Sequence, residues 1–263
     1  MAEQAMAAEG KSVVPAVARA VAILDLLTTT GSRGLTLTEI ARSLGIAKSS
    51  TANLCAELEE QGLISHSGEG YRLGRKLVSL AGAYLGQVDQ VDEFYTQCRR
   101  SKYVSAEAAR LSMLDGLDVL YLARFDGSQP IRLTANIGDR LPAHITATGK
   151  ALLATLPEAA VRDRYQGRPL SPGFTAKSHS TLGSLLADLR ECRQRGYALD
   201  DEETTPGVLC VAVPVIDVPD QPARFAVSAT ILKAREHEIG VPRLVDELVE
   251  IAAAISVPLR ARS

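Results

Sequence analysis

Hydrophobic side chains recur at helical spacing through the first part of the chain. From 13 to 27 they stand every three or four positions, which predicts an amphipathic helix. Thr36, followed three positions later by Glu39, forms a possible capping box, so a second helix is predicted to begin there and to end at Gly45. A third helix is predicted over 47–61, directly before a glycine that is typical of a helix C-terminus.

The pattern then shortens and changes. The segment "LISHSGEGYRL", residues 63–73, reads as two short strands around a glycine-rich turn and predicts a β-hairpin. Residues 75–91 carry apolar side chains along one side of a further predicted helix. This helix could belong to the core of a single domain, but the change of pattern after it favours a linker helix.

Strands and helices alternate in the rest of the chain. The segments "SAEAARLSML" and "GLDVLYLARF" lead to a hairpin turn signal at Asp126-Gly127, and "IRLTANI", residues 131–137, is the predicted return strand. Further strands are predicted in "VLCVAVPVI" and "ARFAVSATI", and helices in "TATGKALLATL", "TLGSLLADLRECRQRG" and "RLVDELVEIAAAIS". Because neighbouring strands are joined by short turns, we expect an antiparallel sheet flanked by helices, an α+β domain.

Composition sets limits on this picture. The chain has 263 residues, enough for one large domain or two ordinary ones, and 46% of them are hydrophobic, so it can build a core. Aromatic residues make up 4% and tryptophan is absent, so that core is mostly aliphatic. The net charge of −2 gives no global sign of a nucleic-acid partner, and any basic surface must be local.

Several classes of protein fit this sequence poorly. The four cysteines, Cys55, Cys98, Cys192 and Cys210, form no C-x-x-C pair, so free thiols are expected rather than a metal site. No apolar run is long enough to span a membrane. The polar segment 1–12 is expected to be a flexible tail and does not resemble a signal peptide, so we expect a cytoplasmic protein without a membrane partner.

Motifs typical of enzymes are also missing. The segment "TATGKAL" lacks the first glycine and the final Ser or Thr of a phosphate-binding loop. No dinucleotide-binding, serine-hydrolase or zinc-protease motif occurs, and the carboxylates of Asp200 and Glu203 lack an evident nucleophile partner. We therefore expect neither catalytic activity nor a cofactor.

The third predicted helix has two different faces. At 100° per residue its leucines share one side, whereas Ser49 and Asn53 lie on the other. Three helices followed by a hairpin form the layout of a winged helix-turn-helix, whose third helix enters the major groove. Asn53 could pair with adenine, Lys48 with guanine or phosphate, and His66 and Arg72 with the flanking DNA backbone. The residues predicted to contact DNA are Arg19, Arg42, Lys48, Ser49, Ser50, Asn53, His66 and Arg72.

A three-helix module with a solvated polar face, used for protein contacts, would explain the same pattern. The first 80 residues hold eight basic and eight acidic residues, so their charge does not decide between the two interpretations. Glu57, Glu59 and Glu60 lie at the far end of the third helix, away from the presumed groove. Because phosphate contacts dominate affinity, a monomer should bind DNA weakly, and we expect a dimer that reads two half-sites.

Segments along nearly the whole chain resemble the IclR family of bacterial transcription regulators. In the first part these are "RAVAILDLL", "LTLTEIARSLGIAKSSTANLCAELEEQGLI" and "YRLGRKLVSLA"; in the second they are "LPAHITATGKALLATL" and "RQRGYALDDEETTPGVLCVAVPVID". The chain also departs from the family. Asn53 stands where members commonly have arginine, Ala47 stands where proline is common, and "SPGFTAKSHSTLG" matches only loosely.

The resemblance implies a fold, partners and a function. It implies a flexible tail at 1–12, a winged helix-turn-helix at 13–74, a linker helix at 75–95 and a GAF-like effector-binding domain at 96–263. It also implies a homodimer or homotetramer. The implied function is that of a ligand-responsive regulator, most often a repressor of a catabolic operon, which binds double-stranded operator DNA and a small organic acid or aromatic compound.

The resemblance further assigns residues to effector binding. They are Leu133, Leu141, Ala147, Thr148, Asp200, Val208, Cys210, Ser228 and Thr230. Backbone N–H groups at the start of the helix around Ala147–Gly149 would suit a carboxylate, and the mixture of hydroxyl and apolar side chains is usual for a small-molecule site. Other interpretations stay open: the three aliphatic residues could be ordinary core, Cys210 an inert thiol, and Asp200 part of a solvated run of charge.

Overall fold

The computed structural model describes residues 13–31, 33–128 and 135–256. The chain divides into two compact units, Met1–Gln87 and Val88–Ser263. The predicted tail at 1–12 lies outside the described residues. Among the helices of the described parts, none is both long enough and apolar enough to cross a membrane.

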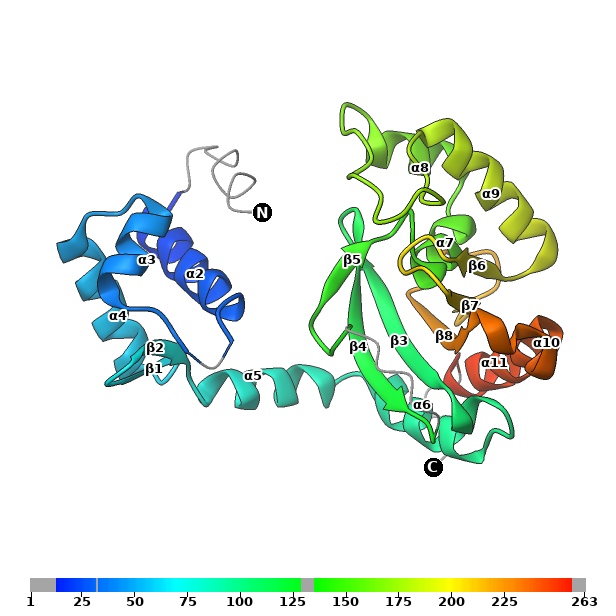
Figure 1. Ribbon diagram of the computed structural model, residues 1–263, viewed down its shortest axis with the longest axis horizontal. Coiled ribbons are helices and arrows are strands. Elements are labelled where there is room, and N and C mark those ends of the chain that lie inside the picture. The colour runs from blue at the N-terminus through cyan, green and yellow to red at the C-terminus, as the bar shows by residue number, and fades with distance from the viewer. Residues whose placement is uncertain (1–12, 32, 129–134, 257–263) are drawn as a thin grey trace. The chain divides into compact units, whose positions relative to one another are not determined.

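The first unit is a group of short helices with a two-stranded hairpin (Figure 1). Its elements are α2 (Pro15–Thr28), α3 (Leu37–Leu44), α4 (Lys48–Glu60), β1 (Ile64–Ser67), β2 (Gly70–Leu73) and α5 (Lys76–Leu85). The predicted capping box is present: Thr36 Oγ1 accepts a hydrogen bond from the Glu39 N–H, and the Glu39 carboxylate accepts one from the Thr36 N–H at 2.8 Å. Gly45 ends α3 in the left-handed region, as predicted, with φ of 61°.

A small aliphatic core holds these elements together. Ile23 and Leu27 of α2 pack with Ile40 of α3 and with Cys55 and Leu58 of α4. These buried positions recur at helical spacing in each segment, which is why the sequence pattern located the three helices. The same packing turns the opposite side of α4 toward solvent.

The predicted helix over 75–91 is two helices. The first, α5, ends at Leu85 before Gly86, and α6 (Asp89–Arg100) starts anew. Glycine is a poor helix former, and the acidic side chains in the first turn of α6 favour a new N-terminus there. No residue of α5 is buried, whereas α6 buries Phe94 and Cys98 in the second unit. The expected linker at 75–95 therefore spans the division between the units at Gln87 and Val88.

The second unit is built on a six-stranded antiparallel sheet, so the predicted α+β architecture is confirmed (Figure 1). The strand order is β5-β4-β3-β8-β7-β6. The strands are β3 (Ala108–Asp115), β4 (Asp118–Asp126), β5 (Arg140–Pro142), β6 (Ala198–Asp201), β7 (Val208–Val215) and β8 (Phe225–Leu232). The helices are α6, α7 (Ala147–Thr155), α8 (Glu158–Tyr165), α9 (Leu182–Arg195), α10 (Glu236–Ile239) and α11 (Val241–Ser256), with 3-10 turns at Val104–Ala106 and Lys233–Arg235.

The helices cover both faces of this sheet. On one face α6 packs against β3 and β4, and α11 packs against β7 and β8. On the other face α7 crosses β6, β7, β8 and β3, and α9 packs outside α7 (Figure 1). The start of α7 therefore lies directly over the central strands.

The hairpin turn predicted at Asp126-Gly127 is neither confirmed nor contradicted, because the chain that follows it, residues 129–134, lies outside the described residues. The strands β3 and β4 pair through the two-residue turn between Asp115 and Asp118, where Gly116 has φ of 64°. At the other end, the Gly127 N–H donates to the Glu107 carbonyl beside the start of β3. Most of the predicted return strand, 131–134, lies outside the described residues, and the strand that pairs with β4 on this side is β5.

Candidate functional site

Polar side chains gather on the sheet face beneath α7. Strand register places Arg110 of β3 opposite Ser228 of β8. In the neighbouring row, Thr230 of β8 lies opposite Cys210 of β7, which lies opposite Asp200 of β6. Residues directly opposite each other in paired strands point to the same face, so this face is polar. The alternate residues, such as Leu111, Val211 and Val227, are buried on the other face.

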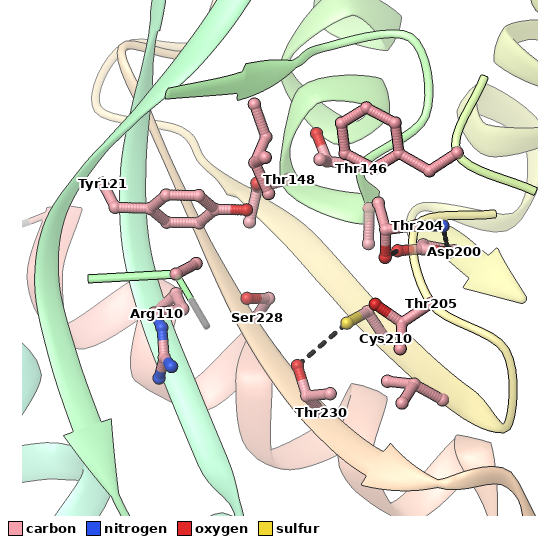
Figure 2. Close-up of a pocket in the computed structure, with 15 residues that line it drawn as sticks. Arg110, Tyr121, Thr146, Thr148, Asp200, Thr204, Thr205, Cys210, Ser228 and Thr230 are labelled. Carbon is pink, nitrogen blue, oxygen red and sulfur yellow. Dashed lines mark hydrogen bonds between the residues drawn. The ribbon is translucent and has the colours of Figure 1, made fainter. Parts of the chain in front are cut away.

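A cavity of about 160 Å³ lies between this polar face and the start of α7 (Figure 2). Eight of the nine residues predicted for effector binding line it: Leu141, Ala147, Thr148, Asp200, Val208, Cys210, Ser228 and Thr230. The ninth, Leu133, lies outside the described residues. Segments that are far apart in the sequence thus meet at one cavity. Their contact with a ligand stays a prediction.

Seven lining residues were missed by the sequence reasoning. They are Arg110, Tyr121, Ala135, Thr146, Phe174, Thr204 and Thr205. One signal was available for Arg110, because polar and apolar residues alternate through "ARLSM" and a strand with that pattern has one polar face. Phe174 gave no such signal, since its loop has no periodicity. It is 54% exposed at the cavity rim.

One backbone N–H group at the N-terminus of α7 already has a hydrogen-bond partner within the chain. Thr146 is its N-cap, and its Oγ1 accepts a hydrogen bond from the Gly149 N–H at 3.2 Å. A Cβ on Gly149 would lie 2.2 Å from the Ala143 carbonyl oxygen, so glycine allows the helix to start close against the preceding segment. The expectation that the N–H groups of Ala147–Gly149 are all available to a carboxylate is therefore wrong for Gly149.

Asp200 lines the cavity, but its carboxylate is hydrogen-bonded to the turn that follows β6. It is 2% exposed, and its Oδ1 accepts hydrogen bonds from the Glu203 N–H at 2.7 Å and the Thr204 N–H at 3.1 Å. Its Oδ2 accepts the Thr204 hydroxyl. Burial raises the pKa of Asp200, and these hydrogen bonds oppose that rise. The carboxyl group therefore fixes the turn after β6, which carries Thr204 and Thr205 to the cavity, and it is not part of a solvated run.

Two further lining groups are poorly suited to nucleophilic chemistry. Cys210 Sγ lies 2.9 Å from Thr230 Oγ1, and burial raises the pKa of the thiol far above its ordinary value. Burial also raises the pKa of Tyr121, while the hydroxyl of Thr148, which it faces in Figure 2, opposes that rise. Both groups stay protonated at neutral pH and can act as hydrogen-bonding surfaces.

Beside the cavity lies a buried charged cluster formed by Lys150, Asp188, Glu203 and His179. The Lys150 ammonium, 1% exposed, bonds to Asp188 Oδ2 at 2.7 Å and to Glu203 Oε1. The His179 Nε2 lies 3.1 Å from the same Asp188 oxygen. Ligand atoms of His179, Asp188 and Glu203 lie within 4.8 Å of one another, a spacing that could hold a metal ion. The Lys150 ammonium binds both carboxylates, however, and so takes the place that a cation would need.

The residues predicted to read DNA bases stand on the outer side of α4. Lys48, Ser49 and Asn53 are exposed and Ser50 is half-buried, whereas Thr51 faces the core. These side chains belong to the first two turns of the helix, and the glutamates follow at its other end. The exposed half of α4 thus offers small hydrogen-bonding groups and one cation, as expected of a helix that reads a groove.

The remaining residues predicted to contact DNA differ in exposure and in the partners that already hold their side chains. Arg19, Arg42 and His66 are exposed. Arg72 is half-buried on β2, pairs with Glu69, and donates from Nη2 to the Arg33 carbonyl at 3.5 Å. Its guanidinium would have to leave these partners, at least in part, to meet a phosphate.

Comparisons with known proteins cover both units. Residues 16–68 match the family described as the IclR helix-turn-helix domain, and residues 83–257 match the bacterial transcriptional regulator IclR C-terminal family. The HTH-type transcriptional regulator XynR of Escherichia coli strain K12 is 31% identical over 93% of this chain and 96% of its own length. The transcriptional repressor IclR of the same strain is 28% identical over 77% of this chain and 76% of its own length.

A solved structure has the same fold. It is the crystal structure of an IclR homologue from Microbacterium hydrocarbonoxydans in complex with 4-hydroxybenzoate, which covers 94% of this chain and 99% of that chain. The two share 24% sequence identity with a TM-score of 0.77.

Proposed function

This chain belongs to the IclR family of bacterial transcriptional regulators, and we propose that it represses a catabolic operon until a small organic acid or aromatic compound binds its second unit. The observation that carries this proposal is the meeting of eight expected effector-binding residues at one cavity. They come from α7 and from β6, β7 and β8, together with β5. The proposal of repression is supported by the similarity of the chain to the transcriptional repressor IclR of Escherichia coli.

The size and lining of the cavity support a small ligand. A volume of about 160 Å³ is comparable with the roughly 150 Å³ engineered cavity that accepts benzene, so a single ring or a short aliphatic acid would fit. The 4-hydroxybenzoate bound by a relative of the same fold is a single-ring carboxylate. No reaction is proposed for the cavity, because Asp200 is engaged by its own turn and the Cys210 thiol stays protonated.

In the first unit, we propose that the N-terminal half of α4 reads operator bases. The exposed amide of Asn53 matches the donor and acceptor of adenine in the major groove, and Lys48 matches guanine or a phosphate. Arg19, Arg42 and His66 would contact flanking phosphates. Because family members commonly have arginine where this chain has Asn53, we propose that this regulator prefers a different base at that position.

A homodimer is proposed for operator binding. Val17 and Val21 on α2 are 60% and 49% exposed, and Val78 and Leu80 on α5 are 74% and 51% exposed. Such apolar side chains gain free energy when a second copy covers them. A dimer would also present two copies of α4, which raises the affinity that the weakly charged monomer lacks.

The proposal is tested by retardation of the chain's own promoter fragment in gels, with and without a series of small carboxylates and aromatic compounds. Retardation that one compound relieves is the expected result. Retardation that no compound changes would remove the effector part of the proposal. Failure to retard any fragment would instead favour the protein-interaction module that the sequence pattern also allows.

A further inference from the structure

One cation on the polar sheet face has unused hydrogen-bonding capacity. Arg110, the third residue of β3, is 3% exposed. Its Nη1 donates to the Ala109 carbonyl at 2.9 Å and to the Phe125 carbonyl at 3.5 Å. Asp126 lies 3.8 Å from the same nitrogen but is largely exposed. Within the described residues, neither Nε nor Nη2 of Arg110 has a hydrogen-bond partner.

The two free nitrogens lie on one edge of the guanidinium. That edge presents parallel N–H groups at the spacing of the two oxygens of a carboxylate, and such paired bonds are among the strongest in proteins. A buried cation with unused donors is costly to the folded state, so its presence at a cavity calls for a partner that arrives from outside. Arg124, which is paired with Arg110 in strand register, adds positive charge and increases that cost.

The position of Arg110 suits an incoming ligand. It lines the cavity across from Asp200, and Figure 2 shows the two at opposite sides. Three strand spacings separate them in the sheet order β3-β8-β7-β6, which is roughly 14 Å. An acidic group would therefore meet a cation at the Arg110 side and would be repelled from the Asp200 side. Ser228, opposite Arg110 in register, adds a hydroxyl at the favourable side.

We propose that Arg110 is the residue that recognises the acidic group of the effector, so that the effector is a carboxylate held by Nε and Nη2 of Arg110. The rest of the ligand extends toward Tyr121 and Thr148 beneath α7. This inference rests on the proposed function, because it takes the cavity to be the effector site. The proposal places the carboxylate of the effector at the sheet and not at the start of α7, where the Gly149 N–H already donates to Thr146 Oγ1.

The test measures binding of acid and amide pairs to the purified full chain by calorimetry. The probes run from formate, which fits any site built for a carboxylate, to 4-hydroxybenzoate, and each is paired with its primary amide. The wild type is expected to bind acids and to bind their amides roughly 10- to 100-fold more weakly. Arg110→Met should abolish this preference and weaken acid binding by a similar factor.

Two further variants keep the test decisive. Arg110→Lys keeps the charge but not the two-nitrogen edge, so it should fold even if Arg110→Met does not and should bind acids roughly tenfold more weakly. Arg124→Gln removes a neighbouring positive charge that already pairs with Asp126, and it should leave the acid preference intact.

The outcomes separate this inference from the proposed function. Unchanged acid binding in both Arg110 variants, or equal binding of acids and amides by the wild type, overturns the role of Arg110 and leaves the cavity as an effector site. Binding of neither acids nor amides by the wild type overturns the carboxylate assignment. If no compound changes promoter retardation either, the effector part of the proposed function is also overturned.

Discussion

The buried ammonium of Lys150 on α7 is held by the carboxylate of Glu203 in the turn after β6. It also bonds Asp188 of α9 at 2.7 Å, so one cation joins three elements. The same turn carries Thr204 and Thr205, which line the cavity. Hydrogen bonds and charges from His179 and Lys150 hold the pKa of Asp188 well below its ordinary value, although burial opposes them. The cluster therefore fixes one wall of the cavity relative to α7.

Replacing the cation of this cluster should cost much of the stability of the second unit. Lys150→Met leaves the Asp188 and Glu203 carboxylates buried without their counter-charge, and we expect the free energy of unfolding to fall by about 3–5 kcal/mol. Urea unfolding followed by circular dichroism measures this. The matched control is Lys177→Met, whose ammonium pairs with Glu202 at the surface and is 52% exposed, and which should change little. Equal effects of the two substitutions would contradict the role of the cluster.

Glu203 should make the stability of the second unit depend on pH. Burial raises its pKa to about 7 from the ordinary 4.5, although Lys150 opposes this. Between these values the folded protein keeps a proton that the unfolded chain has lost. The free energy of unfolding should therefore fall as the pH rises from about 4.5 to about 7, by up to roughly 3 kcal/mol.

Glu203→Gln should remove that slope, as urea unfolding at pH 5 and pH 8 would show. The other charged or titratable groups that face Glu203 are Lys150 on α7, Asp188 on α9, His179 in the preceding loop and Asp200 on β6. A slope that persists in Glu203→Gln would contradict the titration of Glu203 as its cause.

Asn53 should carry base specificity. Its amide is exposed on the second turn of α4, and Asn53→Ala should weaken binding to the operator by roughly 1–3 kcal/mol while leaving binding to unrelated DNA unchanged. Fluorescence anisotropy at fixed salt measures both affinities. Glu60→Ala, an exposed change at the other end of α4, serves as the control and should not weaken binding. Operator affinity that survives the loss of the Asn53 amide would exclude this residue from base reading.

Local patterns were sufficient to predict α2, α3 and α4 of the first unit. The helices α2, α3 and α4 each bury one stripe of residues, so their spacing alone located them, and the Thr36–Glu39 capping box is a contact between near neighbours in the sequence. Helix α5 has no buried residue, so no buried stripe marks its length. The sequence pattern therefore did not predict that the helix ends before Gly86.

The second unit depended more on contacts between distant segments. Two Asp-Gly pairs flank β4, at Asp115 and Asp126, and the local signal for a turn is the same in both. The turn at Asp115 joins β3 to β4, but β3 also pairs with β8, which lies more than a hundred residues later, so no local signal could show that neighbour. Arg110 was missed for the same reason: an arginine in an alternating strand looks exposed until the crossing of α7 over the central strands buries it.

The exposed apolar residues of the first unit should hold two copies together. Val17→Glu combined with Val78→Glu places charges on both apolar surfaces, and we expect the chain to lose its dimer and most of its operator affinity. Sedimentation velocity measures the oligomeric state. The control is Val218→Glu, at a residue of the second unit that is 47% exposed. This variant should sediment as a dimer, as the wild type does. A double variant that sediments and binds DNA as the wild type does would refute this dimer surface.

Thr148 gives the sharpest test of the cavity as the site of control. Its side chain is 2% exposed in the first turn of α7, and Figure 2 shows it beside the hydroxyl of Tyr121. Thr148→Leu removes the hydroxyl and fills part of the space, and we expect the effector Kd to rise about tenfold or more because these losses cost roughly 1–3 kcal/mol. The first unit is untouched, so operator affinity should stay the same while the response to the effector disappears. Thr148→Ser keeps the hydroxyl and should keep the response. Promoter retardation that the effector still relieves in Thr148→Leu would place the controlling site elsewhere in the molecule.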